Sequence, residues 1–200
     1  DVLVLSPRYD EVTKLVPAVF SEPTLDYEHG DHPTLPPIPY NRIDIPLSSM
    51  NPVAECIVEF LSLVGSRLDY LTLLSFFAKP VIRNRFQLDN DQFQQFKQWT
   101  SQAAVRWAAD EKDRSEYNQP DDAKYTWEFG LQRMVLGFSM YTSNNTIFGM
   151  SPLDTIEGGD GYTMLRGVEG ILKILRFVRI CRKPCTVHEW KNRLTSIIDE

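Results

Sequence analysis

The sequence predicts a mainly α-helical fold that starts with a small α/β segment, strand–helix–strand, and continues as a helical domain. The runs "DVLVLS" (1–6) and "IPYNRIDI" (38–45) have the apolar content of short buried strands. They flank "RYDEVTKLVPAVF" (8–20), whose apolar residues recur at helical steps. From residue 51 onward, apolar residues recur mainly at the three- and four-residue steps that place side chains on one helical face.

The α/β segment at the start rests on three short stretches. The run 1–6 is apolar almost throughout, as expected for a strand covered on both faces of a parallel sheet. The helix over 8–20 contains Pro17, which lacks a backbone donor and should kink it. Residues 21–37 hold four prolines between polar residues, and we expect a loop there before the second strand, 38–45. This order is typical of half of a parallel α/β unit.

The rest of the chain is expected to be helical. The first helix has Asn51 as a cap, Pro52 in its first turn and Gly65 at its stop, the usual asymmetry of proline and glycine. The predicted helices cover about 52–64, 68–77, 90–105, 124–141, 162–183 and 186–198. Residues 109–122 hold six acids against two bases and are expected to be an exposed loop, and 142–161 a long connection.

Composition bounds the class of protein. The 42% hydrophobic and 24% charged residues are those of a soluble globular protein, and a net charge of −6 with a pI near 5.1 argues against coating nucleic acid through overall positive charge. Three cysteines are too few for a disulfide framework and favour a cytoplasmic location. No apolar run approaches the length of a membrane span, so we expect no membrane partner. Because the chain begins at Asp1, within a strand pattern, we interpret it as a piece of a larger protein.

The sequence predicts no phosphate-binding loop, no zinc site and no magnesium site. The glycine cluster "EGGDG" (157–161) has acidic neighbours and lacks the GK[ST] of a phosphate-binding loop. Cys181, Cys185 and His188 lie close in sequence, and "HGDH" (29–32) adds two histidines, but these spacings match no zinc pattern. The acids of 109–122 could hold magnesium only if an apolar frame fixed them, and charge runs are usually solvated. We therefore predict no catalytic residue and no metal ligand in this chain.

A basic stripe is the strongest candidate for a binding site. Between Gly161 and Lys183 the chain holds six basic residues and one acid, Glu169, which gives +5 in a chain of −6. The candidate DNA-binding residues lie on the arc opposite the apolar one: Arg166, Lys173, Arg176, Arg179 and Lys183. Such a stripe would suit DNA phosphates or an acidic partner. The alternative is a solvated helix face, with cations favoured near the helix C-terminus.

Five segments, in this order, resemble one family. They are "DVLVLSPRYDEVTKLVPAVF" (1–20), "IPYNRID" (38–44), "NPVAECIVEFLSLV" (51–64), "FQQFKQWTSQAAVRWAADE" (93–111) and "YTWEFGLQRMVLGFSM" (125–140). Together they resemble the RecC family, the gamma chain of bacterial exodeoxyribonuclease V. The resemblance covers most of residues 1–141; beyond 142 it is limited to helical character.

The resemblance implies a fold. The first segment also resembles the start of the second, RecA-like lobe of superfamily 1 helicases, where an arginine that senses nucleotide follows the strand. Here Pro7 stands at about that position and Arg8 one step later, as expected of a helicase fold that has lost its motor motifs. The resemblance therefore implies a helicase-like lobe start at 1–66 and a helical insertion domain at 67–200.

The resemblance also implies a function. The family's gamma chain belongs to a three-subunit helicase–nuclease that resects double-strand breaks and recognises the octamer Chi. The expected role is a non-catalytic DNA-repair and recombination piece, a scaffold for contacts with the beta and alpha chains and a guide for single strands. DNA would be bound through the whole complex, which uses ATP and Mg; no cofactor is expected in this chain, and no Chi-reading residue is assigned. The alternatives are an independent helical adaptor that binds protein only and a metal-dependent nuclease.

The resemblance to a helical insertion domain also suggests a packing role for two glycines in the helix "WEFGLQRMVLG" (127–137). Gly130 and Gly137 should each cost about 1 kcal/mol relative to alanine in a helix interior. They lie seven residues apart and so point in nearly the same direction. We interpret them as points where neighbouring backbones approach closely, with Arg133 between them as an ion-pair or capping partner.

Overall fold

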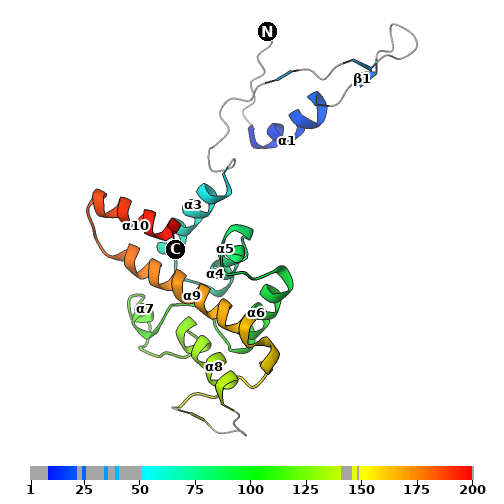
Figure 1. The fold of residues 1–200 in the computed structure, drawn as a ribbon. Coiled ribbons are helices and arrows are strands. Elements are labelled where there is room, and N and C mark those ends of the chain that lie inside the picture. Colours follow the sequence, from blue (N-terminus) through cyan, green and yellow to red (C-terminus); the bar gives the residue numbers. More distant parts are fainter. Residues whose placement is uncertain are drawn as a thin grey trace. The chain divides into compact units, whose positions relative to one another are not determined.

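The computed structural model describes residues 9–21, 24–25, 34–35, 39–40, 51–140, 146–147 and 149–199. The chain divides into two compact units, Asp1–Pro46 and Leu47–Glu200 (Figure 1). The helix that starts at Pro52 therefore lies in the second unit. The assignment of 1–66 to a helicase-like lobe and of 67–200 to an insertion stays a prediction.

The first unit confirms the predicted helix but does not support a RecA-like strand–helix–strand. Helix α1 (Tyr9–Phe20) continues through position 17. Strands β1 (Thr24–Leu25) and β2 (Thr34–Leu35) pair antiparallel within the stretch expected to be a loop. Two strands that follow each other closely can pair only in this way, because a parallel pair needs a long crossover. The expected strand 1–6 lies outside the described residues, as does 38–45 except Pro39 and Tyr40, which are not in a strand.

The second unit is helical, as predicted. Its elements are α3 (Pro52–Val64), α4 (Tyr70–Phe77), α5 (Pro80–Arg85), α6 (Asn90–Gln102), α7 (Glu111–Ser115), α8 (Trp127–Ser139), the 3₁₀ turn η1 (Gly158–Asp160), α9 (Gly161–Arg182) and α10 (Val187–Asp199). Every predicted helix is confirmed within a few residues. The short helices α5 and α7 were not predicted, since one or two turns leave too little periodicity to detect.

Local sequence explains where these helices begin. The side chain of Asn51 accepts a hydrogen bond from the Val53 amide at 2.9 Å, with proline next in the chain. Asp89 and Gln92 form a capping box at the start of α6, with bonds of 2.8 and 3.0 Å. Thr126 caps α8. These caps are local, since each joins residues no more than three positions apart.

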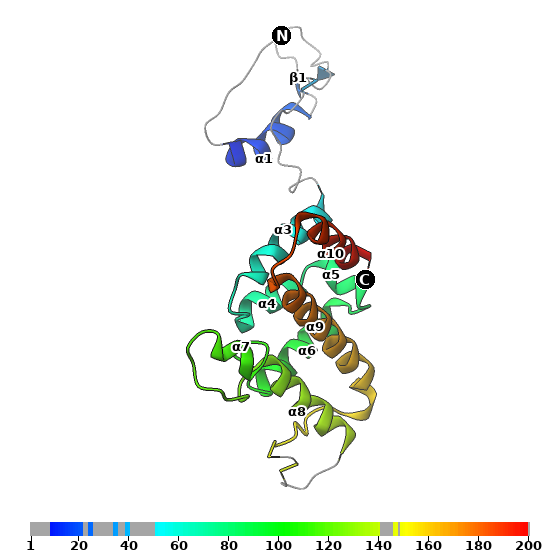
Figure 2. The same ribbon diagram turned by 90° about the vertical axis from the view of Figure 1, so that its left-hand side faces the viewer.

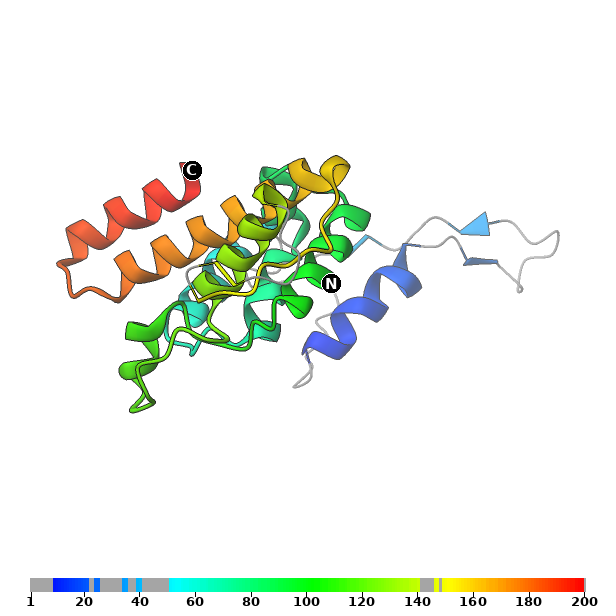
Figure 3. The ribbon, with the colours of Figure 1, turned by 90° about the horizontal axis from the view of Figure 1, so that it is seen from below.

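Helix α9 is the central helix of the second unit. It packs against α3, α6, α8 and α10, and Figures 2 and 3 show these helices arranged along its length. Close approach needs its glycines: a Cβ at Gly167 would overlap the ring of Phe96, and one at Gly170 would lie 2.6 Å from the ring of Phe77. Phe77 in turn packs edge-on against Phe96 at 6.0 Å between centroids.

In α8, Gly137 has the predicted role of letting another backbone approach closely, whereas Gly130 makes room for a side chain. A Cβ at Gly137 would overlap the backbone carbonyl of Leu153, and one at Gly130 would overlap the side chain of Val105. Arg133 lies between them and donates to the carbonyl of Ala103 at 2.8 Å. Ala103 is the C-terminal cap of α6, so the interpretation of Arg133 as a capping residue is confirmed.

Candidate functional site

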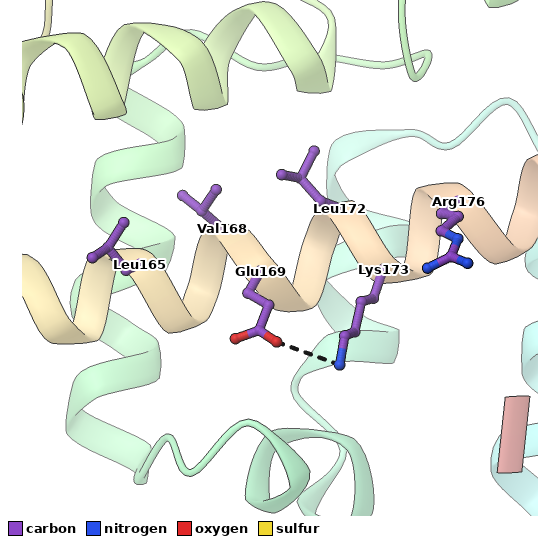
Figure 4. Close-up of a pocket in the computed structure, with 6 residues that line it drawn as sticks. All are labelled: Leu165, Val168, Glu169, Leu172, Lys173 and Arg176. Carbon is purple, nitrogen blue, oxygen red and sulfur yellow. Dashed lines mark ion pairs between the residues drawn. The ribbon is translucent and has the colours of Figure 1, made fainter. Parts of the chain in front are cut away.

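The candidate site is the outer side of α9, where the sequence placed a basic stripe. The apolar arc of the helix is buried in the core, so its charged residues lie toward solvent. Figure 4 shows part of this side, with Glu169, Lys173 and Arg176 near the exposed Leu165 and Leu172. The surface here is a shallow hollow along the helix.

The first two predicted cations are held by neighbours. Arg166 donates to the carbonyl of Gln87 at 3.3 Å and to the hydroxyl of Tyr162, with its guanidinium 4.0 Å from the Tyr162 ring centroid. Lys173 forms an ion pair with Glu169, four residues earlier, at 3.3 Å between Nζ and Oε1. Both cations are half-buried and already have intramolecular partners, although only the charge of Lys173 is balanced by an acid.

Arg179 joins the basic stripe to the acidic run. Its Nη2 lies 2.7 Å from Oδ2 of Asp110 and 2.6 Å from Oε1 of Glu128. Burial alone would lower the pKa of Arg179, but the hydrogen bond to Glu128 and the nearby carboxylates outweigh it and raise the pKa. The guanidinium therefore stays charged and is already bound by two acids.

Arg182 was missing from the predicted set and is the most connected of the α9 cations. It forms an ion pair with Asp113. It also donates to the carbonyls of Val64 at 2.9 Å and Ser66 at 2.7 Å, and so caps the C-terminal end of α3. Its position four residues after the buried Val178 was the available signal, because i and i+4 share a helical face.

The prediction that the acidic run 109–122 is an exposed loop is therefore wrong in part. Asp113 is only 6% exposed, and its Oδ2 also accepts from the Ala109 amide at 2.7 Å. Asp110 and Asp113 are three residues apart, as are Arg179 and Arg182, so the short helix α7 and the end of α9 meet in register. Local charge counting missed this because each acid and its base lie 69 residues apart.

Two predicted cations remain open. Among the described residues, the side chains of Arg176 and Lys183 make neither a hydrogen bond nor an ion pair, and both are exposed. They lie seven residues apart, about 10.5 Å along the helix. Of the five predicted DNA-binding residues, the structure therefore brings three into intramolecular contacts and leaves two available to a ligand.

The described residues contain neither a metal-binding cluster nor a membrane-spanning helix. No group of three or more His, Cys, Asp or Glu side chains is placed to hold a metal ion there, and His29 and His32 lie outside the described residues. Burial raises the pKa of the Cys56 and Cys181 thiols. None of the described helices has the length and apolarity that would let it cross a bilayer.

Comparison with known proteins gives consistent matches. The family model described as RecBCD enzyme subunit RecC fourth domain matches residues 50–200. The chain is 28% identical to RecBCD enzyme subunit RecC of Escherichia coli (strain K12) over 158 residues, 79% of the chain and 13% of the relative. It is 26% identical to the Mycolicibacterium smegmatis subunit, over 100% of the chain and 19% of the relative. For Mycobacterium tuberculosis the identity is 25%, over 78% of the chain and 14% of the relative. The chain thus spans less than a fifth of the length of these relatives.

Proposed function

This chain belongs to the RecC family of RecBCD enzyme subunits, and on that premise we propose that it is a non-catalytic scaffold piece of a DNA-processing helicase–nuclease. In the proposed role it contributes to double-strand break repair and recombination. It would hold the fold of its subunit and contact the beta and alpha chains, while ATP hydrolysis with Mg and strand cleavage take place on other subunits in the cytoplasm.

One observation supports the scaffold role above the others. The two features that could have carried chemistry, the acidic run and the basic stripe, are joined to each other by Arg179 and Arg182. Charges used in this way fix α7 and the end of α3 against α9. They stabilise one arrangement of the helices, which is what a scaffold needs from charged groups.

The scaffold proposal is tested in a full-length RecC subunit that carries this segment. Arg182→Met should lower the amount of three-subunit complex recovered by size-exclusion chromatography, because the segment would be less stable. The exonuclease activity per assembled complex should stay that of the parent. Arg176→Met, an exposed change on the same helix, is the matched control. A fall in activity per assembled complex with full assembly would contradict the proposal.

A second role, guidance of a single strand, is favoured by the two open cations. Arg176 and Lys183 are exposed and lie two turns apart on one helix, so they are available to phosphates. We propose that they contact the strand within the whole complex. An independent adaptor that binds protein only would not need exposed cations at these two positions to contact DNA.

Fluorescence anisotropy of a labelled single-stranded oligonucleotide at two salt concentrations tests the strand contact. If both cations meet phosphates, Arg176→Glu with Lys183→Glu should weaken binding and reduce the salt slope by about 1.4, at about 0.7 per phosphate. The control is Lys97→Glu with Lys191→Glu, which makes the same charge change on exposed positions of α6 and α10. Equal loss in the two double variants would refute a specific contact and leave the scaffold role.

A further inference from the structure

A cluster of cationic and aromatic side chains lies in the second unit, apart from the basic stripe. The Cζ atom of Arg67 lies 4.4 Å from the ring centroid of Trp107 and 5.7 Å from that of Tyr117. The two rings pack edge-on at 6.0 Å between centroids. Arg114 brings a second guanidinium to 5.4 Å from the Trp107 ring centroid. The rings attract the charge of Arg67 but accept no conventional hydrogen bond from it.

Strained backbone holds these side chains in place. Each of the three residues Arg67, Trp107 and Tyr117 is followed by one with a positive φ: Leu68 at 56°, Ala108 at 63° and Asn118 at 56°. The amide of Ala108 donates to the carbonyl of Arg67 at 3.1 Å, and the hydroxyl of Tyr117 donates to the carbonyl of Ser66 at 3.0 Å. These bonds join the three segments. Positive φ is unfavourable for a bulky residue such as leucine, and strained positions of this kind gather at functional sites.

The guanidinium of Arg67 is held in place but keeps its hydrogen-bond donors. Arg67 is exposed, and within the part of the chain that the structure describes its side chain makes neither a hydrogen bond nor an ion pair. Arg114, in contrast, donates to the carbonyls of Asp122 at 2.8 Å and Lys124 at 3.1 Å. A guanidinium offers five N–H donors in a planar fork that matches an oxyanion. Because the rings already restrict Arg67, it loses less side-chain freedom when it binds one.

The surroundings favour a single carboxylate over a row of phosphates. Asp69 follows Arg67 by two positions, Glu116 directly precedes Tyr117, and both acids are exposed. A nucleic-acid strand carries a negative charge on every nucleotide, so several of its phosphates would be repelled by acids near this site. One carboxylate needs only one guanidinium fork. Arginine, tryptophan and tyrosine are also the residues enriched at the centres of protein interfaces.

We propose that Arg67 binds a polypeptide carboxylate in a bidentate ion pair beside the rings of Trp107 and Tyr117. The carboxylate comes from outside residues 1–200, either from another part of the same subunit or from another subunit. The inference goes beyond the proposed function, because it uses neither the contacts of Arg182 nor the open cations Arg176 and Lys183. It gives a role to strained positions that the scaffold contacts leave unexplained.

Acetate tests the site in the chain Asp1–Glu200. The Nε–H signal of Arg67 is followed by ¹⁵N NMR, and Arg67→Gln identifies it by its loss. We expect acetate to shift this signal with a dissociation constant at least about fivefold lower than at Arg176, an exposed arginine without a described ring contact. Acetamide, which is similar in shape but uncharged, should shift neither signal. Dimethyl phosphate, a monoanion that mimics the nucleic-acid backbone, should bind Arg67 more weakly than acetate.

Variants of Trp107 test whether the rings prepare the site. Trp107→Leu removes one aromatic face and should bring the acetate affinity of Arg67 down to that of Arg176. Trp107→Phe keeps a ring and should keep most of the difference. Far-UV circular dichroism confirms that each variant retains its helices. If Trp107→Leu does not fold, the titration of the parent chain still decides between binding and its absence.

Carbodiimide coupling identifies the source of the carboxylate in a full-length RecC subunit that carries this segment. In Arg67→Lys, the new amine can form an amide with a carboxylate paired at this position, the carbodiimide taking up the water lost. Mass spectrometry then identifies the joined peptide. A link formed in the subunit alone assigns the carboxylate to the same subunit, and one formed only in the three-subunit complex assigns it to another. Arg176→Lys is the control and should give less of the linked product.

Four outcomes would overturn the inference. They are equal acetate affinity at Arg67 and Arg176, tighter binding of dimethyl phosphate than of acetate, no link above the control, and a link only to the neighbouring Asp69 or Glu116. None of them bears on the scaffold role, which is measured by complex assembly in the Arg182→Met subunit. Failure of the carboxylate site and failure of the proposed function are therefore distinguishable.

Discussion

Replacing Arg182 with methionine should destabilise the second unit more than any other single change among the α9 cations. The substitution keeps the aliphatic bulk of the side chain and removes the guanidinium. It leaves Asp113, which is 6% exposed, without its ionic partner. It also removes the donors to the carbonyls of Val64 and Ser66, although Ser66 keeps a hydrogen bond from the Tyr117 hydroxyl at 3.0 Å.

The magnitude follows from burial. Removing one partner of a buried ion pair costs about 3–5 kcal/mol. Because the Arg182 side chain is 22% exposed, we take the lower end, about 3 kcal/mol. Arg179→Met should cost only about 1 kcal/mol, since that side chain is 43% exposed and its partners reach solvent. Arg176→Met, which removes no described contact, should change stability by less than about 0.5 kcal/mol.

Urea unfolding followed by tryptophan fluorescence measures these differences. All four tryptophans lie in the second unit, so the signal reports that unit alone. With a slope of about 2 kcal/mol per molar urea, Arg182→Met should lower the midpoint by about 1.5 M. A midpoint within about 0.3 M of Arg176→Met would refute the argument that the pair with Asp113 is structural.

A double-mutant cycle separates the ion pair from the capping bonds. Asp113→Asn removes the stranded carboxylate, so the double variant with Arg182→Met should be at least about 1 kcal/mol more stable than the sum of the single effects. Strict additivity would assign the loss to the two carbonyls at the end of α3 instead.

Two further predictions concern α8 and α10. Gly137→Ala should lower the free energy of unfolding by about 1–3 kcal/mol, because the new Cβ would overlap the backbone of Leu153, which cannot rotate away. Gly65→Ala, whose Cβ would lie 3.8 Å from its nearest neighbour, is the control in the same urea assay and should be nearly neutral. Hydrogen bonds from the amide and hydroxyl of Thr186 lower the pKa of Glu189, so its capping contribution is present above the ordinary value of 4.5 and is lost as pH falls through the lowered pKa. Amide exchange in the first turn of α10 should therefore gain protection with rising pH through the acid range; if Glu189→Gln shows the same gain, the carboxylate is not its source.

Much of the structure of the second unit could be predicted from the sequence. Apolar steps of three and four residues located α3, α6, α9 and α10, and short polar side chains such as Asn51 marked helix starts. These signals are local, since they depend on neighbours within one or two turns. The roles of Gly137 and Arg133 were also predicted, because a glycine inside an apolar helix has few explanations other than close packing.

The first unit and the charges were harder to predict. The loop expected at 21–37 contains two short antiparallel strands, since proline and polar content indicates loops without excluding a brief ladder. The candidate site was predicted as a set of five equivalent cations. The structure divides them into cations with intramolecular partners and cations that stay exposed. Arg166 and Lys173 are held by side chains near them, and Arg179 by acids far away in sequence.

The sequence by itself determined the helical class, the approximate helix ends, the apolar arc of the helix at 162–183 and the family. Each of these depends on spacing within one segment or on the order of matching segments. Only the tertiary structure decided which charges remain available. Arg179 and Arg182 meet acids 69 residues away, and a helical wheel shows which side of a helix a residue takes but not what lies opposite it.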